Sequence, residues 1–560
     1  MSEPTSAPTP VHAFGDRAWD QFLELDPLWA TVQGDERWDD RLDDPGPAGR
    51  AALAALCEAW EAEMDGFAGL ELSVEDRISL GLIRFAVERF RGGLELRLWE
   101  LEAVDQYGGP QGLMGDLARI QRADTPERLE RLLARIEAYP EWMAAHRANL
   151  AAGVASGRTA AAAVVERCLA QTRRMVEAPA EESPVVLANQ SLAPERRARL
   201  VAAVEAHVQP ALRAWLEALE QYRPHARAGD GICHLADGEA IYRHAVLTWT
   251  TIEEEPQAIH DYGLQRLAQI EARARDIVVE LGFEDVTALR RHLETAPENH
   301  VTEPAQLVPL AVELVERAEA AAPRWFGRLP ADSCEVLPVE PHMEQEAPPA
   351  FYMPPTGDGS RRGMYFINTY DPASRHLHRL AATTFHEAVP GHHFQLAINQ
   401  ELADLPAFRR FGARLAAGSF IEGWALYTEQ LADEMGLYRT PYERFGALET
   451  EAWRAARLVV DTGIHVLGWT RQQSIDLLVS RAGLSQLEAE TETDRYISWP
   501  GQALSYMIGQ REILALRARL EARDGDRFDH QAFHDQVIGH GSLALSVLRE
   551  QLPDWVAPAD

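Results

Sequence analysis

One twelve-residue stretch constrains this chain more than any other, because it sets metal-binding side chains on both sides of a helix breaker. It runs from Thr384 to Gln395 and reads TFHEAVPGHHFQ, with three histidines and a glutamate inside what otherwise reads as one helix. Pro390 lacks the amide hydrogen that a helix needs, and Gly391 tolerates the unusual backbone angles that follow such a break. The sequence therefore predicts a bulge between Ala388 and Gly391.

The bulge decides which histidines can share an ion. In the HExxH motif of zinc peptidases, two histidines four positions apart bind the metal, and the glutamate takes a proton from water. Here the second histidine follows His386 after six or seven positions. A bulge of two residues places His392 beside His386, whereas a bulge of three places His393 there. We expect His386 and His392 to be the ligands, with His393 as the alternative, and Glu387 to be the general base.

A glutamate on the next predicted helix is the candidate for a third ligand. The segment GSFIEGWALYTE, residues 418–429, contains Glu422 and Glu429. Catalytic zinc sites use three protein ligands and leave one position open, and a downstream glutamate is a recurring choice. We expect Glu422 to be that ligand, with Glu429 in reserve. Ser419 and Glu422 also fit a capping box, so Glu422 has an alternative role as a helix cap.

Two later motifs offer groups that could contact a substrate. In RLVVDTGIH, residues 457–465, Asp461 lies one helical turn before His465 and could orient its ring. In RYISWPGQALSY, residues 495–506, Tyr506 offers a neutral donor of the kind that stabilises an oxyanion. His465 and Tyr506 are therefore candidate catalytic residues. Both have the alternative interpretation of ordinary core residues.

Length and composition indicate a large globular protein that is mainly helical. The 560 residues are 46% hydrophobic and 25% charged, and exceed what one ordinary core supports. Ala, Leu, Glu and Arg at helical spacing predict helices, and the length predicts two lobes or one large helical body with a cleft. The cluster AGDG, residues 228–231, is the expected boundary between an N-terminal helical lobe, 1–228, and a catalytic lobe, 229–560.

A proline-rich passage from Arg328 to Pro355 interrupts the helices and predicts a small sheet just before the histidine motif. Short strands are expected at 335–337 and 364–369. The free edge of such a sheet could pair with an extended peptide through backbone hydrogen bonds. The alternative is a cover strand without a ligand.

Charge and targeting features narrow the partners and the compartment. A formal net charge of -33 disfavours nucleic acid and anionic membranes as partners. The four cysteines are scattered, which fits a reduced compartment. The first residues lack a secretory signal, and no apolar stretch of about 18 residues could span a membrane. We expect a cytoplasmic protein, whereas oligomeric state is not indicated.

Taken in this order, HEAVPGHHFQ, EGWALYTE, RLVVDTGIH and RYISWPGQALSY resemble a bacterial domain-of-unknown-function family, DUF885, whose members carry an HEAxPGHH signature. That family resembles the helical zinc peptidases that include thermostable metallocarboxypeptidases, thimet oligopeptidase and angiotensin-converting enzyme. The resemblance implies a zincin-like fold, with a large two-lobed helical body, a deep cleft and a small sheet beside the zinc helices. It also implies one zinc ion per chain. The implied roles are metal ligand for His386, His392 and Glu422, general base for Glu387, and substrate or oxyanion contact for His465 and Tyr506.

Three functions remain open at this point. The first is a zinc peptidase that hydrolyses short peptides, from the C-terminus or internally. The second is a zinc hydrolase of a non-peptide amide or ester, since a fold does not fix a substrate. The third is a non-catalytic peptide-binding protein whose motif no longer holds metal.

Overall fold

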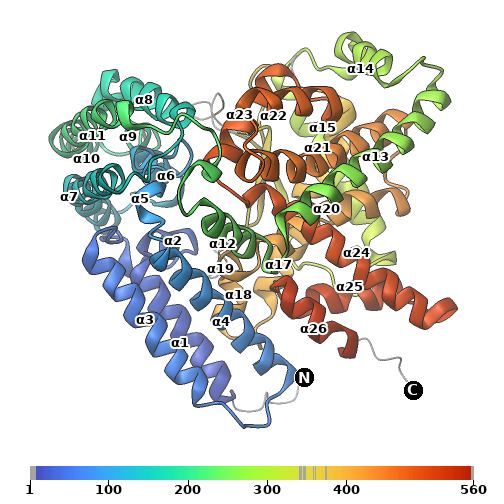
Figure 1. Cartoon of the computed structure of the whole chain (residues 1–560), viewed down its shortest axis with the longest axis horizontal. Helices are drawn as coiled ribbons and strands as arrows, with labels where there is room; N and C mark the ends of the chain where they lie inside the picture. Colours follow the sequence, from blue (N-terminus) through green and yellow to red (C-terminus); the bar gives the residue numbers. More distant parts are fainter. Residues whose placement is uncertain are drawn as a thin grey trace.

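Helices make up most of the chain (Figure 1). A small sheet is inserted among them. The computed structural model describes residues 8–339, 344, 348–356, 359, 361–372 and 375–555. The prediction of a mainly α fold is confirmed. Over these ranges, no helix combines the length and the apolar character that crossing a membrane requires.

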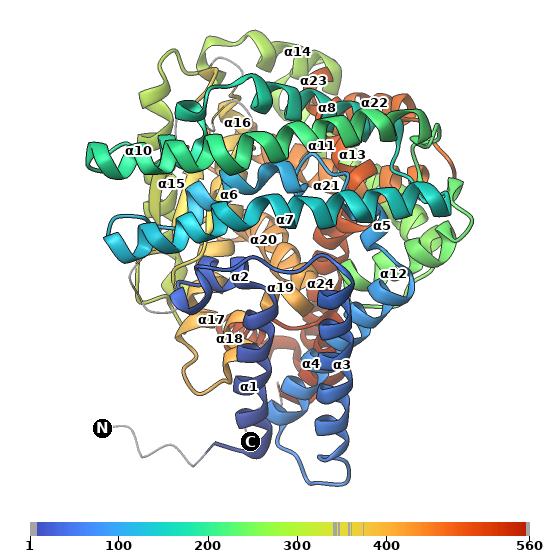
Figure 2. The ribbon, with the colours of Figure 1, turned by 90° about the vertical axis from the view of Figure 1, so that its left-hand side faces the viewer.

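Helices α1 to α11 lie together on one side of the molecule, where the long helices α7 and α11 run side by side (Figure 2). The sequence explains how α7 begins, because the Thr125 side chain accepts from the Arg128 N–H and Pro126 occupies the first turn. The bounds of these helices are α1 Pro10–Leu25, α2 Pro27–Val32, α3 Pro47–Asp65, α4 Val74–Glu95, α5 Trp99–Glu102, α6 Leu113–Ile120, α7 Pro126–Ser156, α8 Ala162–Glu177, α9 Pro184–Leu187, α10 Pro194–Ala203 and α11 Gln209–Tyr222.

The remaining helices include α16, which packs against both α20 and α21. Their bounds are α12 Gly238–Thr250, α13 Pro256–Leu281, α14 Val286–Thr295, α15 Leu307–Ala321, α16 Leu377–Glu387, α17 His392–Glu401, α18 Ala407–Phe411, α19 Ala413–Ala416, α20 Gly418–Glu434, α21 Pro441–His465, α22 Arg471–Leu477, α23 Gln486–Ser498, α24 Ser505–Asp524, α25 His530–Gly539 and α26 Leu545–Trp555.

The predicted small sheet is present just before α16. In the described part of the proline-rich passage it contains β1 Glu335–Pro338, β2 Ala350–Met353 and β3 Met364–Ile367. The central strand β3 pairs in parallel with β1 and antiparallel with β2. The first and third strands were predicted, whereas β2 was missed because prolines flank it on both sides. As an edge strand, β2 lies against both α16 and α17.

Two glycines let α20 and α24 approach each other at the level of the candidate site. A Cβ atom on Gly423 would lie 2.4 Å from the Cα of Gly509, and one on Gly509 would lie 1.9 Å from the Ser419 carbonyl oxygen. Neither position leaves room for a larger residue. Because these glycines follow Glu422 and Tyr506 closely in sequence, the crossing brings those two side chains into one region.

The two predicted lobes are in direct contact. The Trp499 Nε1–H donates to Asp105 over 2.7 Å, and Arg167 on α8 forms an ion pair with Asp494 on α23. Both contacts join a residue before position 228 to one after it. The boundary at 228 and the deep cleft both stay predictions.

Candidate metal centre

The histidine motif is split between two helices. Helix α16 ends at Glu387, and α17 begins at His392. Between them, Ala388 and Gly391 have φ/ψ of -106°/-105° and -79°/-128°, which are not helical. The expected bulge within one helix is therefore corrected to a complete interruption, because the Pro390–Gly391 pair stops the hydrogen-bond ladder instead of bending it.

The interruption brings His392 back to His386. The Nε2 atoms of His386 and His392 lie 3.5 and 3.4 Å from the same atom, Glu422 Oε2. One ligand atom from each of the three residues falls within 4.8 Å of the other two, a spacing that a single ion can bridge. The three side chains expected as ligands are thus gathered in one place.

His393 points its ring into other contacts. Its Nε2–H donates to the Asp332 carbonyl oxygen over 3.0 Å, and its Nδ1 accepts from the Tyr352 hydroxyl over 3.0 Å. Burial lowers the pKa of His393 to about 4, so the ring is neutral at physiological pH. With both ring nitrogens engaged, His393 ties α17 to β2 and the proline-rich passage. His392, and not His393, therefore lies at the point that His386 and Glu422 share.

Glu422 does not cap its helix. The N-cap position of α20 is Ala417, and the Ser419 hydroxyl donates to the Trp249 carbonyl oxygen instead of closing a capping box. The capping alternative is wrong, because Ser419 already lies inside the first turn. Within the described residues, Glu422 Oε2 is a buried atom without a hydrogen-bond partner. A buried carboxylate oxygen in this state calls for a cation.

The charges around His386 fit a metal ion. Burial opposes ionisation of Glu422, yet contacts with His386 and His392 outweigh it and hold the pKa of that carboxyl well below its usual range. Burial likewise lowers the pKa of His386, but Glu422 and Glu429 reverse this and raise it to about 10. The pocket thus favours positive charge between its carboxylates. A dication that replaces the proton meets the same demand, so the donor set fits zinc.

Glu429, the reserve ligand, acts on the far side of His386. The His386 Nδ1–H donates to Glu429 over 2.8 Å, and the Thr450 hydroxyl donates to the same carboxylate over 2.6 Å. With a metal ion in place of the second ring proton, this bond would fix the tautomer whose Nε2 faces Glu422. The sequence held the signal, because Glu422 and Glu429 are seven residues apart and so lie on one face of a helix.

Glu387 occupies the last position of α16, next to His386 in sequence, and its side chain is partly exposed. Burial lowers the pKa of His386, and Glu422 and Glu429 raise it. The negative charge of Glu387 makes a smaller contribution in the same upward direction. A carboxylate with access to solvent beside the ligand cluster matches what a general base requires.

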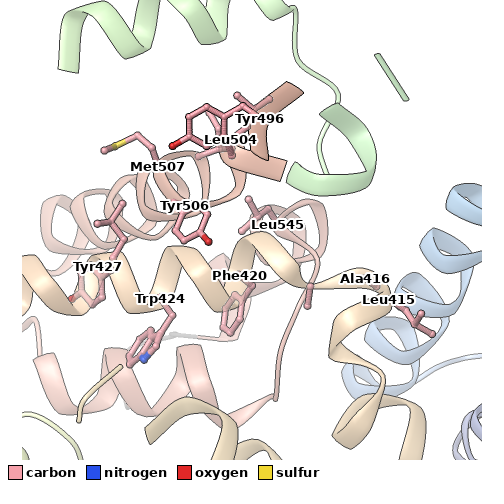
Figure 3. Packing of buried hydrophobic residues seen from close by; sticks show 14 of the residues in the cluster. Leu415, Ala416, Phe420, Trp424, Tyr427, Tyr496, Leu504, Tyr506, Met507 and Leu545 are labelled. Carbon is pink, nitrogen blue, oxygen red and sulfur yellow. The ribbon is translucent and has the colours of Figure 1, made fainter. Parts of the chain in front are cut away.

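Tyr506 lies close to the cluster. Its ring centroid is 6.4 Å from that of His386, with the two rings nearly parallel at 21°. Figure 3 shows Tyr506 on α24, on the opposite side of α20 from Phe420 and Trp424. The hydroxyl oxygen of Tyr506 accepts from Arg495 Nη2 over 3.4 Å, which leaves its O–H to donate elsewhere.

His465 is not brought to this cluster. Its Nδ1 accepts from the Ile232 N–H over 3.2 Å, and its Nε2–H donates to the Tyr496 carbonyl oxygen over 2.9 Å. Burial lowers the pKa of His465 to about 3. Asp461 accepts from the Tyr242 hydroxyl and the Gly501 N–H, so the expectation that it orients His465 is corrected. These contacts give His465 a structural role.

Two arginines beside Tyr506 were not recognised as site residues from the sequence. The Arg457 guanidinium lies 4.4 Å from the Tyr506 ring centroid and 4.5 Å from that of Trp453. Arg495 reaches the same tyrosine from α23. The four-residue step from Trp453 to Arg457 places them on one face of α21, but nothing in the sequence indicated that α23 and α24 would converge there.

Comparisons with known proteins agree on the fold. The DUF885 family, described as bacterial protein of unknown function, matches residues 27–552. The chain is similar to the crystal structure of a "putative lipoprotein" from Colwellia psychrerythraea, with a TM-score of 0.89 and 26% identity over 97% of this chain and 98% of that one.

A second similar structure, a "putative lipoprotein of unknown function" from Shewanella oneidensis, has a TM-score of 0.76 and 20% identity over 97% of this chain and 100% of that one, and shows the fold alone. No curated protein matches the chain. The family match spans nearly the whole sequence, and the chain therefore belongs to the DUF885 family of bacterial proteins.

Proposed function

We propose that the protein is a zinc-dependent peptidase that hydrolyses short peptides. The observation that carries the proposal is the convergence of His386, His392 and Glu422 on one point, with Glu422 Oε2 buried and lacking a hydrogen-bond partner among the described residues. Two imidazoles and one carboxylate form the donor set of catalytic zinc sites in hydrolases. Manganese or cobalt can occupy such a set as well, so zinc is the first ion to test.

In the proposed reaction, each residue of the cluster and its surroundings has a separate role. A zinc ion held by His386, His392 and Glu422 would supply a Lewis acid that activates water and polarises a carbonyl. Glu387 accepts the proton of the attacking water and returns it to the leaving amine. The Tyr506 O–H donates to the oxygen that becomes negative as the carbonyl carbon turns tetrahedral. Glu429 keeps the His386 ring in the required tautomer.

Two other functions compete with this proposal. The same residues would serve hydrolysis of a non-peptide amide or ester, because the reacting carbonyl group is shared. A peptide-binding protein without catalysis would use the edge strand β2, which lies beside α16 and α17. The peptidase is favoured over the binding protein because Glu387 stands beside a complete ligand set, which binding alone does not require.

A cytoplasmic location is also a proposal. It rests on the four cysteines, all of which have free thiols. The two similar structures are described as those of putative lipoproteins, a description that indicates a location outside the cytoplasm for those two proteins. Fractionation of cells that express the chain, with detection in cytosolic, periplasmic and membrane fractions, decides the matter.

The decisive functional test is a panel of short peptides and simple amides and esters, each incubated with and without a chelator. We expect peptides to be cut, chelator to stop the reaction, and zinc to restore it. Glu387→Gln should keep the metal and lose at least about 100-fold in kcat, because general-base catalysis contributes on the order of 10²–10⁴. Cleavage of only esters or amides would replace the peptidase with the second function. Full activity in Glu387→Gln would remove Glu387 from its role.

A further inference from the structure

A cavity of about 230 Å³ lies among α13, α20, α21 and α24. Its lining includes Glu429, whose carboxylate also takes the Nδ1–H of His386. The lining does not include His386, His392, Glu422 or Tyr506. The volume exceeds the about 10–15 Å³ that one water needs, and it falls below the about 300–1,000 Å³ of sites for drug-sized ligands. The cavity therefore has the size for a small ligand, and Glu429 is the residue that it shares with the metal centre.

Two buried amide oxygens in the lining have no hydrogen-bond donor within the described ranges. Gln510 on α24 is only 1% exposed, and its Nε2–H donates to the Leu426 carbonyl oxygen over 3.1 Å. The Oε1 of the same amide is buried without a partner, and the Oε1 of Gln430 on α20 is in the same state. Leaving a buried acceptor unpaired is unfavourable, so this lining calls for a ligand that brings N–H or O–H donors.

The ionic groups of the lining leave negative charge in excess. Each of the three lining glutamates has a cationic partner: Glu280 pairs with Arg444, Glu451 with Arg273 and Arg266, and Glu429 with His386 and Arg454. Two further carboxylates in the lining, Asp276 and Asp433, are exposed and define the rim of the cavity. Neither has an ion pair in the part of the chain that the structure describes. Two negative charges at the rim are thus available to a cation.

A protonated amine matches these features better than an anion or a metal ion. Among the described residues, the only unpaired donor in the lining is the Arg444 Nε–H, and that guanidinium already holds both oxygens of Glu280. The described part of the chain contains one group of three side chains spaced for a metal ion, and it is the group at His386. An ammonium group instead supplies three N–H donors and one positive charge. Leu426 and Leu448 give the cavity apolar walls for a methylene chain.

We propose that this cavity is a binding site for a small alkyl diamine. One ammonium group donates to the amide oxygens of Gln430 and Gln510, and the other lies at the rim beside Asp276 and Asp433. The site goes beyond the proposed peptidase function, since it uses neither the metal ligands nor Glu387. The net charge of -33 attracts amines to the whole surface, so selectivity for this cavity comes from the buried oxygens.

Titration calorimetry with 1,4-diaminobutane tests the site in about 0.15 M salt, where exposed charges are largely screened. The comparison ligands are n-butylamine, 1,4-butanediol and magnesium chloride, because each keeps only one part of the chemistry of the diamine. We expect one diamine to bind per chain, at least about 10-fold more tightly than butylamine, with no saturable binding of the diol.

Three results of this titration would overturn the proposal. The first is no saturable binding of the diamine, and the second is equal binding of diamine and diol. The third is displacement of the diamine by an equal concentration of magnesium, which would assign the site to a metal ion.

Variants then assign the binding to the cavity. Gln510→Met removes the buried acceptor at nearly constant size and should weaken diamine binding about 10-fold, the effect of one hydrogen bond to a charged group. Asp433→Asn should weaken it about 3-fold, since exposed charges contribute less. Ala447→Leu adds volume to the lining without changing any charge and should prevent saturable binding. Asp404→Asn is the matched control, because Asp404 is an exposed aspartate outside the lining.

Wild-type affinity in Gln510→Met would contradict the assignment. If Gln510→Met does not fold, the other two lining variants keep the test valid, because neither removes a buried hydrogen bond. Wild-type affinity in both Asp433→Asn and Ala447→Leu would then overturn the proposal.

Chelator separates this site from the metal centre, because an amine nitrogen can also bind zinc. The diamine should bind saturably before and after the metal is removed. Binding that disappears with the metal would assign the amine to the metal centre and overturn the proposal. The titration needs no peptide cleavage, so a failure of the peptidase function leaves its result unchanged. Failure of the diamine to bind likewise leaves the peptidase function intact.

Discussion

Glu429 binds the Nδ1 side of the His386 ring, whereas Glu422 faces Nε2 on the other side. Its carboxylate takes the Nδ1–H of His386 and the hydroxyl of Thr450, and both bonds are buried. Glu429→Gln keeps the size of the side chain but removes the charge that holds this tautomer. We expect zinc affinity to fall about 10- to 100-fold, measured by competition with a chromogenic chelator. Unchanged affinity would show that the bond does not support the ligand.

His465 gives a pH dependence of stability. Burial lowers its pKa to about 3, below the value of 6.5 expected in the unfolded chain. The unfolded state therefore binds one more proton between these values, so the contribution of His465 is complete above pH 6.5 and is lost as the pH falls towards 3. In His465→Gln, the slope of unfolding free energy against pH between 4.5 and 6 should decrease by about 1.4 kcal/mol per pH unit.

Urea unfolding at several pH values measures that slope for both proteins. Glutamine can still donate to the Tyr496 carbonyl oxygen, which makes it the suitable replacement. An identical slope in the two proteins would mean that His465 is not the buried neutral ring described here.

At the residue scale, the sequence predicted which side chains gather at one point, and it missed their electrostatic partners. His386, Glu422 and one of two adjacent histidines were identifiable because metal ligands come from few residue types at restricted spacings. The separation of His392 from His393 depended on the backbone of four residues, which spacing alone does not determine. Arg457 and Arg495 were missed because their position beside Tyr506 depends on how α21, α23 and α24 pack together, which the sequence does not show.

At the element scale, Gly391 allows α17 to begin directly beside the end of α16. A Cβ atom there would lie 1.9 Å from the His386 carbonyl oxygen and 2.4 Å from that of Phe385. We expect Gly391→Ala to cost about 1–3 kcal/mol in unfolding free energy and to weaken zinc binding, because the added atom moves His392 away from His386.

Gly418→Ala is the matched control, since no atom lies within 4 Å of the added Cβ at the start of α20. It should change stability by no more than about 0.5 kcal/mol. Chemical denaturation and zinc titration of both variants test the difference. Equal behaviour of the two would show that the close approach at Gly391 does not position His392.

Elements with a strong local signal were predicted, and those that depend on distant contacts were not. The capped start of α7 follows from Thr125 and Pro126. The end of α16 follows from Pro390, although the extent of the interruption did not. Strand β2 forms because β3 supplies its hydrogen bonds, and its own flanking prolines masked it.

At the scale of the whole molecule, the close packing of α20 against α24 brings Glu422 and Tyr506 into one region. The sheet packs the proline-rich passage against the two histidine helices, α16 and α17. A mainly α fold was predictable because helical periodicity is a local property of sequence. How helices far apart in the chain converge was not, since packing partners leave little trace in either sequence alone.

The central claim is that this fold holds one metal ion at His386, His392 and Glu422. The most direct test is the metal content of the purified protein, by mass spectrometry of the digested sample, beside that of His386→Ala. We expect about one zinc ion per chain in the wild type and none in the variant. No metal in either protein, or equal metal in both, would contradict the claim.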